Sequence, residues 1–233
     1  MTKLLTIDTS TYVLSVGLYE NAQVLAEYVS TKKENHSVRL MPAVRSVMED
    51  AGMSPAELDG IAVAAGPGSY TGVRIGVTTA KSMAWALEKP LYGVSSLEAL
   101  AYNGLWSSAR ILSFFDARRG QAFAGIYESE DGVLHQAEAD SMVMLEDLLT
   151  RLAEQGRPVL ALSPDLDKHR ELLQQKLGSL FIDAPGPLHT VRPAGVWAAS
   201  SGKTAEDLHT FVPQYLRLAE AEANWQRKQN EHG

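Results

Sequence analysis

The sequence predicts an α/β protein built from two similar units, and three observations support this prediction. Short apolar stretches of strand length alternate with longer stretches in which apolar residues recur at helical spacing. Each half of the chain begins with three consecutive strands joined by short turns, and helices and further strands follow. The halves share no residue-level repeat, so the duplication rests on the order of the elements. A duplicated α/β layout is therefore expected instead of one doubly wound sheet.

The first half is expected to begin with an antiparallel meander, because polar turns separate three apolar stretches. A long helix follows, in which apolar residues recur at helical spacing before Gly52, a common helix stop. A second long helix begins after a glycine-rich turn, with Thr71 as its N-cap. The predicted elements are strands at 3–8, 13–19 and 24–29, a helix at 35–51, a strand at 61–65, a helix at 72–87, a strand at 91–94 and a helix at 96–102.

The second half repeats this order, and Gly120 and the Asp131-Gly132 pair mark the turns of its meander. The predicted elements are strands at 111–116, 122–127 and 133–138, a helix at 145–153, a strand at 159–162, and helices at 166–177 and 193–201. We therefore divide the chain into a first lobe (1–102), a second lobe (103–218) and a polar tail (219–233) that is expected to fray.

The glycine-rich turn at 66–72 is the strongest local signal. It joins a buried strand to a helix N-terminus, where backbone N–H groups can gather around an anion. Such a turn also occurs without any ligand. Neither the P-loop pattern nor the dinucleotide fingerprint fits, because the required Lys-Ser/Thr pair and third glycine are missing. In the helix that follows, Gly76, Ala80 and Ala84 form a row of small residues that would let another helix approach closely.

A polar turn, Asp8-Thr9-Ser10, follows the first buried strand. These residue types hydrogen-bond their own backbone in turns, and Asp8 could equally contact a phosphate or a metal-bound water. The spacing alone does not choose between the two interpretations. The candidate phosphate or nucleotide residues are Asp8, Thr9, Ser10, Gly66, Gly68, Ser69 and Gly72.

Composition narrows the possible functions. The chain has no cysteine, which excludes disulfides, thiolate zinc sites and cysteine nucleophiles. Its formal net charge is −7, whereas a protein that grips nucleic acid alone usually carries a large basic surface. The basic pairs Lys32-Lys33, Arg118-Arg119 and Arg227-Lys228 are small and are interpreted as solvated surface. No apolar run reaches membrane-spanning length, so a cytoplasmic protein without membrane contact is expected.

Three segments of the sequence resemble one family. They are IDTST after the first strand, AAGPGSYTGVRIGVTTAKSMAWAL in the middle and VPQYLRLAEAE near the end. The resemblance, to the bacterial TsaB (YeaZ) family of the actin-like, Hsp70-like and sugar-kinase-like (ASKHA) superfamily, covers residues 1–222. It implies two actin-like lobes, each a mixed sheet flanked by helices. It also implies a role in making threonylcarbamoyladenosine on tRNA, as the non-catalytic partner of the transferase TsaD and the small ATPase TsaE.

The same central motif occurs in the catalytic TsaD family, so the segment after it must distinguish the two. The catalytic family carries two metal-binding histidines four residues apart on a helix, and the matching positions here are Ser96 and Leu100. The six histidines of this chain form no i, i+3 or i+4 pair. The resemblance therefore implies no catalytic residue and no metal ligand. Two alternatives stay open: an ATP-dependent kinase of the same superfamily, suggested by Asp8 and Asp116, and a glycoprotease-like hydrolase.

The resemblance also implies how the chain assembles. Helices 35–51 and 72–87 are expected to lie side by side and to turn apolar, small-residue faces outward, forming a four-helix seam with TsaD or with a second copy. We expect a homodimer when the chain is alone, and tRNA contact only through the complex. No cofactor is required alone, and ATP or ADP with magnesium should bind weakly or not at all. The predicted partner-binding residues are His36, Leu40, Met41, Val44, Val73, Gly76, Ala80, Met83, Ala84 and Leu87.

Overall fold

The first sheet has the predicted meander at one side and two parallel strands at the other. A computed structural model describes residues 2–216. The strands run in the order β3-β2-β1-β4-β5, with β1 antiparallel to β2 and parallel to β4. The carboxyl ends of β1 and β4 therefore meet at one edge of the sheet. The strands are β1 (Lys3–Asp8), β2 (Leu14–Glu20), β3 (Gln23–Ser30), β4 (Gly60–Ala64) and β5 (Leu91–Val94).

The second sheet has the same topology, which confirms the duplicated α/β layout. Its order is β8-β7-β6-β9-β10, with β6 antiparallel to β7 and parallel to β9. Strand β10 was not predicted, because three residues are too few to show an alternating pattern. The strands are β6 (Arg110–Arg118), β7 (Gln121–Glu130), β8 (Val133–Met144), β9 (Val159–Leu162) and β10 (Phe181–Asp183).

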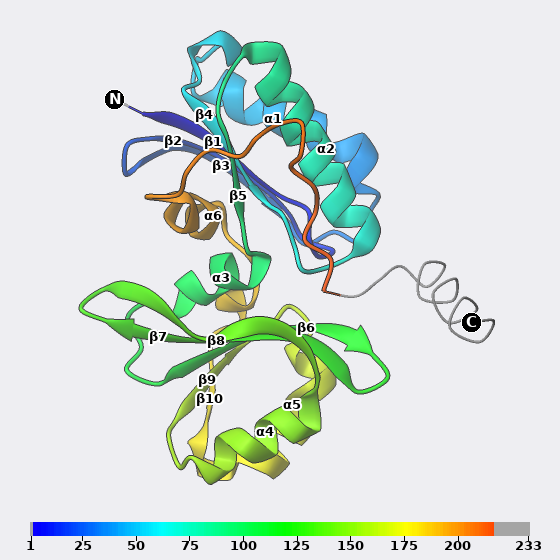
Figure 1. Ribbon diagram of the computed structural model, residues 1–233, viewed down its shortest axis with the longest axis vertical. Coiled ribbons are helices and arrows are strands. Elements are labelled where there is room, and N and C mark those ends of the chain that lie inside the picture. Colours follow the sequence, from blue (N-terminus) through cyan, green and yellow to red (C-terminus); the bar gives the residue numbers. More distant parts are fainter. Residues whose placement is uncertain (1, 217–233) are drawn as a thin grey trace, which may run out of the picture.

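Helices form three layers around the two sheets (Figure 1). One pair covers the first sheet, one pair covers the second sheet from below, and two short helices lie between the sheets. The helices are α1 (His36–Asp50), α2 (Tyr70–Leu87), α3 (Ser96–Ala101), α4 (Leu145–Glu154), α5 (Leu166–Leu177) and α6 (Pro193–Ser200).

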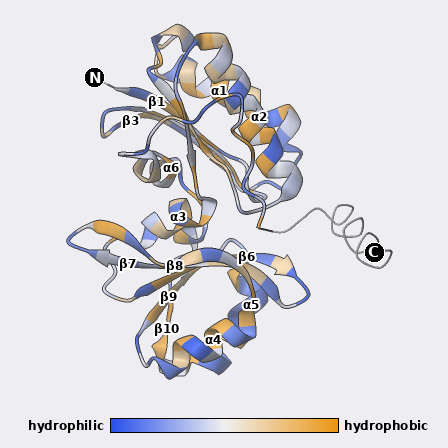
Figure 2. Ribbon diagram, viewed as in Figure 1, coloured by the Kyte–Doolittle hydropathy of each residue, from blue (hydrophilic) through white to orange (hydrophobic). Residues whose placement is uncertain are grey.

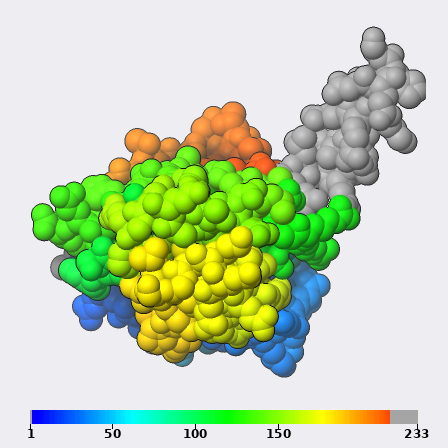
Figure 3. Space-filling model, turned by 90° about the horizontal axis from the view of Figure 1, so that it is seen from below, coloured from blue at the N-terminus to red at the C-terminus, as the bar shows by residue number. Residues whose placement is uncertain are grey.

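Local sequence explains the long helices. The Asn35 side chain caps α1 by accepting a hydrogen bond from the Ser37 N–H, and α4 turns four leucines onto the second sheet. Blue and orange accordingly alternate along α4 and α5 in Figure 2. Helix α2 begins at Tyr70 with Ser69 as its N-cap, so the predicted cap at Thr71 was wrong by two residues. Viewed from below, the second lobe covers most of the molecule (Figure 3).

The third helix of each half of the chain packs on the sheet of the other half. Helix α3, from the first half, packs on the second sheet through Leu97 and Leu100. Helix α6, from the second half, lies on the first sheet, where Trp197 stacks on Tyr19 with ring centroids 5.7 Å apart. Gly17 lets the start of α6 approach β2 closely, because a Cβ at residue 17 would stand 2.5 Å from the Pro193 Cβ.

The segment after α6 also returns to the first lobe. Phe211 is buried in that lobe's core, and the Gln214 N–H donates to the Ala65 carbonyl at 2.7 Å. The predicted assignment of all of 103–218 to the second lobe is therefore wrong for α6 and for residues 206–216. The predicted tail, 219–233, lies outside the described residues. Within residues 2–216, none of the helices combines the length and apolar character needed to cross a membrane.

Candidate functional site

A cleft of about 760 Å³ opens between the two lobes. Its walls are the β1–β2 turn, the turn before α2, the β6–β7 hairpin, the start of α5 and residues 214–216. The carboxyl ends of β1, β4 and β6 all point to it, which is where open α/β sheets bind ligands. The volume is also that of an ordinary small-ligand pocket. The cleft is therefore the first place to look for a binding site.

The two predicted phosphate turns lie together at this cleft, but they contact each other. The Ser69 N–H donates to the Ser10 carbonyl at 2.6 Å, and the Thr9 hydroxyl donates to the Gly72 carbonyl at 2.7 Å. A Cβ at Gly68 would stand 2.2 Å from the Ser10 oxygen. The glycines thus admit the chain's own backbone, and the Ser69 N–H of the predicted anion nest is already hydrogen-bonded within the chain.

Asp8 lies beneath these turns and is almost fully buried. Its Oδ1 accepts the Ser10 N–H at 2.6 Å, while its Oδ2 has no hydrogen-bond partner among the described residues. Burial raises the pKa of Asp8, although the bonds from Ser10 and the nearby His36 oppose this shift. A single carboxylate is a poor magnesium site without a phosphate ligand to complete it. The residues here could therefore hold magnesium only together with such a ligand.

Asp116 lies near the carboxyl end of β6 in the second lobe, as Asp8 lies at that of β1, and it forms part of the other wall of the cleft. The Lys168 ammonium lies 2.6 Å from Asp165 Oδ1 and 3.4 Å from Asp116 Oδ2. Burial alone would raise the pKa of Asp116, but the Arg118 N–H and Lys168 outweigh it and lower this pKa. The carboxylate that the kinase hypothesis needs in this lobe is therefore already paired with a cation.

The positions of the catalytic family's two histidines lie between the sheets, where the Ser96 N–H donates to the Gly66 carbonyl of the glycine turn at 2.9 Å. Ser96 and Leu100 are fully buried on α3, and Glu98 of the same helix pairs with Lys203 at 3.0 Å. Across residues 2–216, no three or more histidine, aspartate or glutamate side chains are grouped as metal ligands.

The outer face of α1 and α2 differs from the predicted one. The two helices lie side by side on the first sheet (Figure 1), but the small-residue row of α2 faces inward. A Cβ at Gly76 would stand 2.5 Å from Thr9 Oγ1. Six of the predicted partner-binding residues are similarly buried within the lobe: His36, Leu40, Val44, Val73, Ala80 and Ala84. The prediction that these residues face outward was wrong, because the apolar stripe of each helix packs against the sheet of its own lobe.

Other residues form the exposed part of this face. Met41 was predicted and is 49% exposed, and Met83 and Leu87 are half-buried. Val38, which is 68% exposed, and Trp85, which is 72% exposed, were missed. Their signal was present in the sequence, since each is an apolar residue on the side of its helix opposite the buried stripe. We call Val38, Met41 and Trp85 the outer face.

Comparisons with known proteins agree with one another. The family described as TsaD, tRNA N6-adenosine threonylcarbamoyltransferase, matches residues 23–225. The tRNA threonylcarbamoyladenosine biosynthesis protein TsaB of Bacillus subtilis (strain 168) is 48% identical over 222 residues, or 95% of this chain and 97% of that protein. TsaB of Escherichia coli (strain K12) is 30% identical, over 92% of this chain and 94% of that protein.

A solved structure has the same fold. YeaZ from Pseudomonas aeruginosa superimposes with a TM-score of 0.78 at 24% identity, covering 93% of this chain and 100% of that one. The expected fold of two α/β lobes, each a mixed sheet that starts with a three-strand meander and is flanked by helices, is confirmed.

Proposed function

The chain belongs to the TsaB family, and from that premise we propose that it is a non-catalytic subunit in the synthesis of threonylcarbamoyladenosine on tRNA. In this role it binds the catalytic paralogue TsaD and activates it, and the ATPase TsaE joins the pair. Contact with tRNA takes place within that assembly, in the cytoplasm.

The observation that carries the proposal is the exposed apolar outer face. Val38, Met41 and Trp85 lie on two adjacent helices that together cover one side of the first lobe. Large apolar side chains exposed on one side of a lobe are typical of protein contacts, and exposed tryptophan is frequent among residues that dominate binding. We assign this face to TsaD in the complex, and to a second copy of the chain when TsaD is absent.

The chemistry of α3 supports a non-catalytic role. Where the catalytic family has its histidine pair, this chain has Ser96 and Leu100, neither of which is a usual metal ligand. Internal packing of the glycine turn likewise supports weak binding of ATP or ADP, or none, by the isolated chain. No cofactor is required for the proposed role.

Reconstitution tests the proposal. We expect purified chain, TsaD, TsaE, threonylcarbamoyl adenylate and unmodified tRNA to give threonylcarbamoyladenosine, measured by nucleoside chromatography, and omission of the chain to abolish it. The chain alone, freed of TsaD, should modify no tRNA. Product in the absence of TsaD, or an unchanged yield without the chain, would overturn the proposal. Calorimetry with magnesium and ATP is the companion measurement: micromolar binding lost on Asp8→Ala would favour the kinase alternative.

A further inference from the structure

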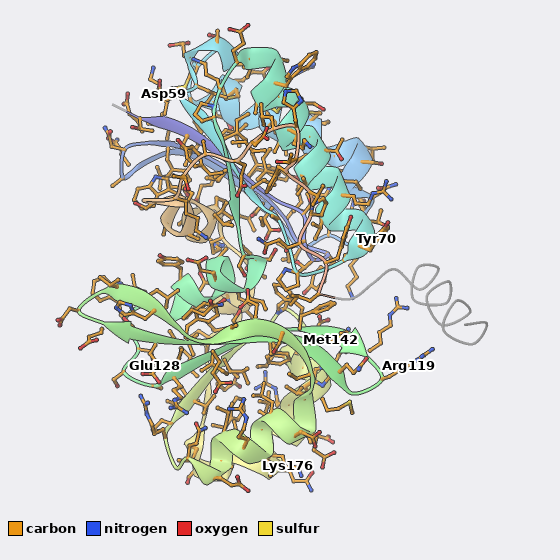
Figure 4. The ribbon with its side chains drawn as sticks, in the orientation of Figure 1. Asp59, Tyr70, Arg119, Glu128, Met142 and Lys176 are labelled. Atoms are coloured by element: carbon orange, nitrogen blue, oxygen red, sulfur yellow. The ribbon has the colours of Figure 1, made fainter. Side chains whose placement is uncertain are left out.

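Basic side chains that are far apart in the sequence gather at the mouth of the interlobe cleft. Arg118 and Arg119 line the cleft from the second lobe. Lys33 lies over the Tyr12 ring, with its Nζ 5.1 Å from the centroid, and Tyr12 lines the cleft from the first lobe. In Figure 4, Tyr70 and Arg119 lie on the same side of the molecule, one from each lobe. The Arg118-Arg119 pair and one lysine of the Lys32-Lys33 pair thus border one opening.

These cations are not neutralised by neighbouring acids. Among residues 2–216, no salt bridge joins a carboxylate to Lys33, Arg118 or Arg119, or to Arg74, which stands over the Tyr70 ring at 5.3 Å. Lys168, by contrast, is held by Asp116 and Asp165. In a chain of net charge −7, this local excess of unpaired positive charge marks a place for an anionic ligand.

Aromatic rings alternate with the charges. Tyr70 and Tyr215 stack on each other with centroids 4.9 Å apart, and both are exposed and line the cleft. Tyr12 lies at the same opening, where its hydroxyl donates to the Pro164 carbonyl at 3.2 Å. Cations that follow a phosphate backbone, with rings on which bases stack, are the usual means of holding single-stranded nucleic acid.

We infer that the cleft mouth, formed by Lys33, Arg74, Arg118, Arg119, Tyr12 and Tyr70, binds an unpaired segment of RNA. Two features favour RNA over a free nucleotide. At the glycine turn, the Ser69 N–H already donates to the Ser10 carbonyl and the Gly72 N–H to the Ser69 hydroxyl, so these two amides are not free for a triphosphate. The unpaired cations also span both lobes along the rim. The inference rests on the proposed function in one respect: tRNA is taken as the natural source of the unpaired segment. None of the outer-face residues belongs to this RNA site.

The test is fluorescence anisotropy of the full-length chain with an end-labelled single-stranded oligoribonucleotide at several salt concentrations. The variant Arg118→Asn/Arg119→Asn removes two charges, and asparagine tolerates the φ angles of 68° and 55° found there. We expect Kd to rise about fivefold or more. The slope of log K against log salt should fall by about 1.4, because each phosphate contact on a single strand contributes about 0.7.

A matched control removes two charges at the far end of the first lobe. Lys3→Gln/Lys89→Gln should leave Kd and the salt slope unchanged. A second pair tests stacking: Tyr12→Leu should weaken binding, whereas Tyr12→Phe, which loses the bond to Pro164 but keeps the ring, should not. Urea midpoints of all variants and capture of TsaD are measured in parallel, so that loss of RNA binding is separated from unfolding and from failure of the proposed function.

Several results would overturn the inference. These are no measurable RNA binding by the native chain at low salt, an arginine variant that binds like the native chain, and a control variant that loses as much. If the native chain bound double-stranded RNA as tightly as single-stranded RNA, stacking of unpaired bases on the tyrosine rings would be excluded. Displacement of RNA by magnesium ATP at micromolar concentration would assign the cleft to a free nucleotide instead.

Discussion

Thr9 and Gly76 lie so close that a side chain at residue 76 would force helix α2 or Thr9 to shift. A Cβ at Gly76 would stand 2.5 Å from Thr9 Oγ1, and that hydroxyl donates to the Gly72 carbonyl at 2.7 Å. Thr9 is buried, so its short side chain cannot turn away without losing this bond. The contact fixes α2 against the β1–β2 turn.

Gly76→Ala should therefore destabilise the protein even though alanine favours helices. We expect the free energy of unfolding to fall by about 1–3 kcal/mol, the usual cost of overpacking, measured by urea denaturation. Thr78→Ala, on the exposed side of the same helix, is the control and should change it by less than about 0.5 kcal/mol. Equal urea midpoints for Gly76→Ala and the native chain would contradict the packing described.

Phe211 tests whether the segment after α6 is part of the first lobe. Its ring packs where Gly93 leaves space, and the Lys81 ammonium donates to the Phe211 carbonyl at 2.7 Å. We expect Phe211→Ala to lower the free energy of unfolding by about 3–5 kcal/mol, as for other buried phenylalanines. Val212→Ala, next to it but exposed, should have little effect. Comparable small losses for both variants would mean that the segment does not contribute to the lobe's core.

Asp8 should make stability depend on pH. Burial raises its pKa above the ordinary value of 3.8, so the unfolded chain releases this proton at lower pH than the folded protein does. Ionised Asp8 therefore costs stability, increasingly as pH rises from about 4 through its folded-state pKa. Asp8→Asn cannot ionise and keeps an acceptor for the Ser10 N–H.

The variant should gain stability relative to the native chain across that range, by at most about 1.4 kcal/mol per pH unit. Urea denaturation of both proteins between about pH 4 and pH 8 measures the difference. A variant that instead loses stability relative to the native chain as pH rises would show that ionised Asp8 is stabilised in the folded state.

Asp140 joins the first half of the chain to the second sheet. It accepts hydrogen bonds from the hydroxyls of Ser95, the N-cap of α3, and Tyr127, and from the Gln136 amide. Asp140→Ala leaves these donors without their acceptor and should cost about 1–3 kcal/mol in thermal or urea unfolding. Gln136→Ala removes only one exposed donor and is expected to be nearly neutral. If the two variants lose the same stability, Asp140 is not the centre of this network.

Local sequence patterns predicted most of the helices and strands, but not which part of the molecule packs against each of them. The row Gly76, Ala80 and Ala84 correctly indicates a close contact, and the sequence does not say whether its partner is another chain or, as found, the β1–β2 turn. Helix α6 is apolar on nearly every side because it lies between two sheets, so its periodicity cannot show which lobe it covers.

The candidate site was predictable to a similar degree. The Asp8 turn and the glycine turn were both singled out from the sequence, and they lie together because they follow parallel strands whose ends meet at one sheet edge. Their direct contact was not foreseen, since it depends on backbone distances of a few ångströms. Convergence of Lys33 and Arg118 at one cleft was also beyond prediction, because it results from the packing of two lobes.

The central claim is that TsaD binds the outer face of α1 and α2, and sedimentation velocity with labelled TsaD tests it most directly. Met41→Arg places a charge on that face at an exposed site, and Val133→Arg places the same charge at a similarly exposed site on β8. We expect the native chain and Val133→Arg to be dimers alone and to bind TsaD. Met41→Arg should remain folded but be monomeric, with a Kd for TsaD raised about 100-fold or more. Binding of TsaD by Met41→Arg as tightly as by the native chain would contradict the claim.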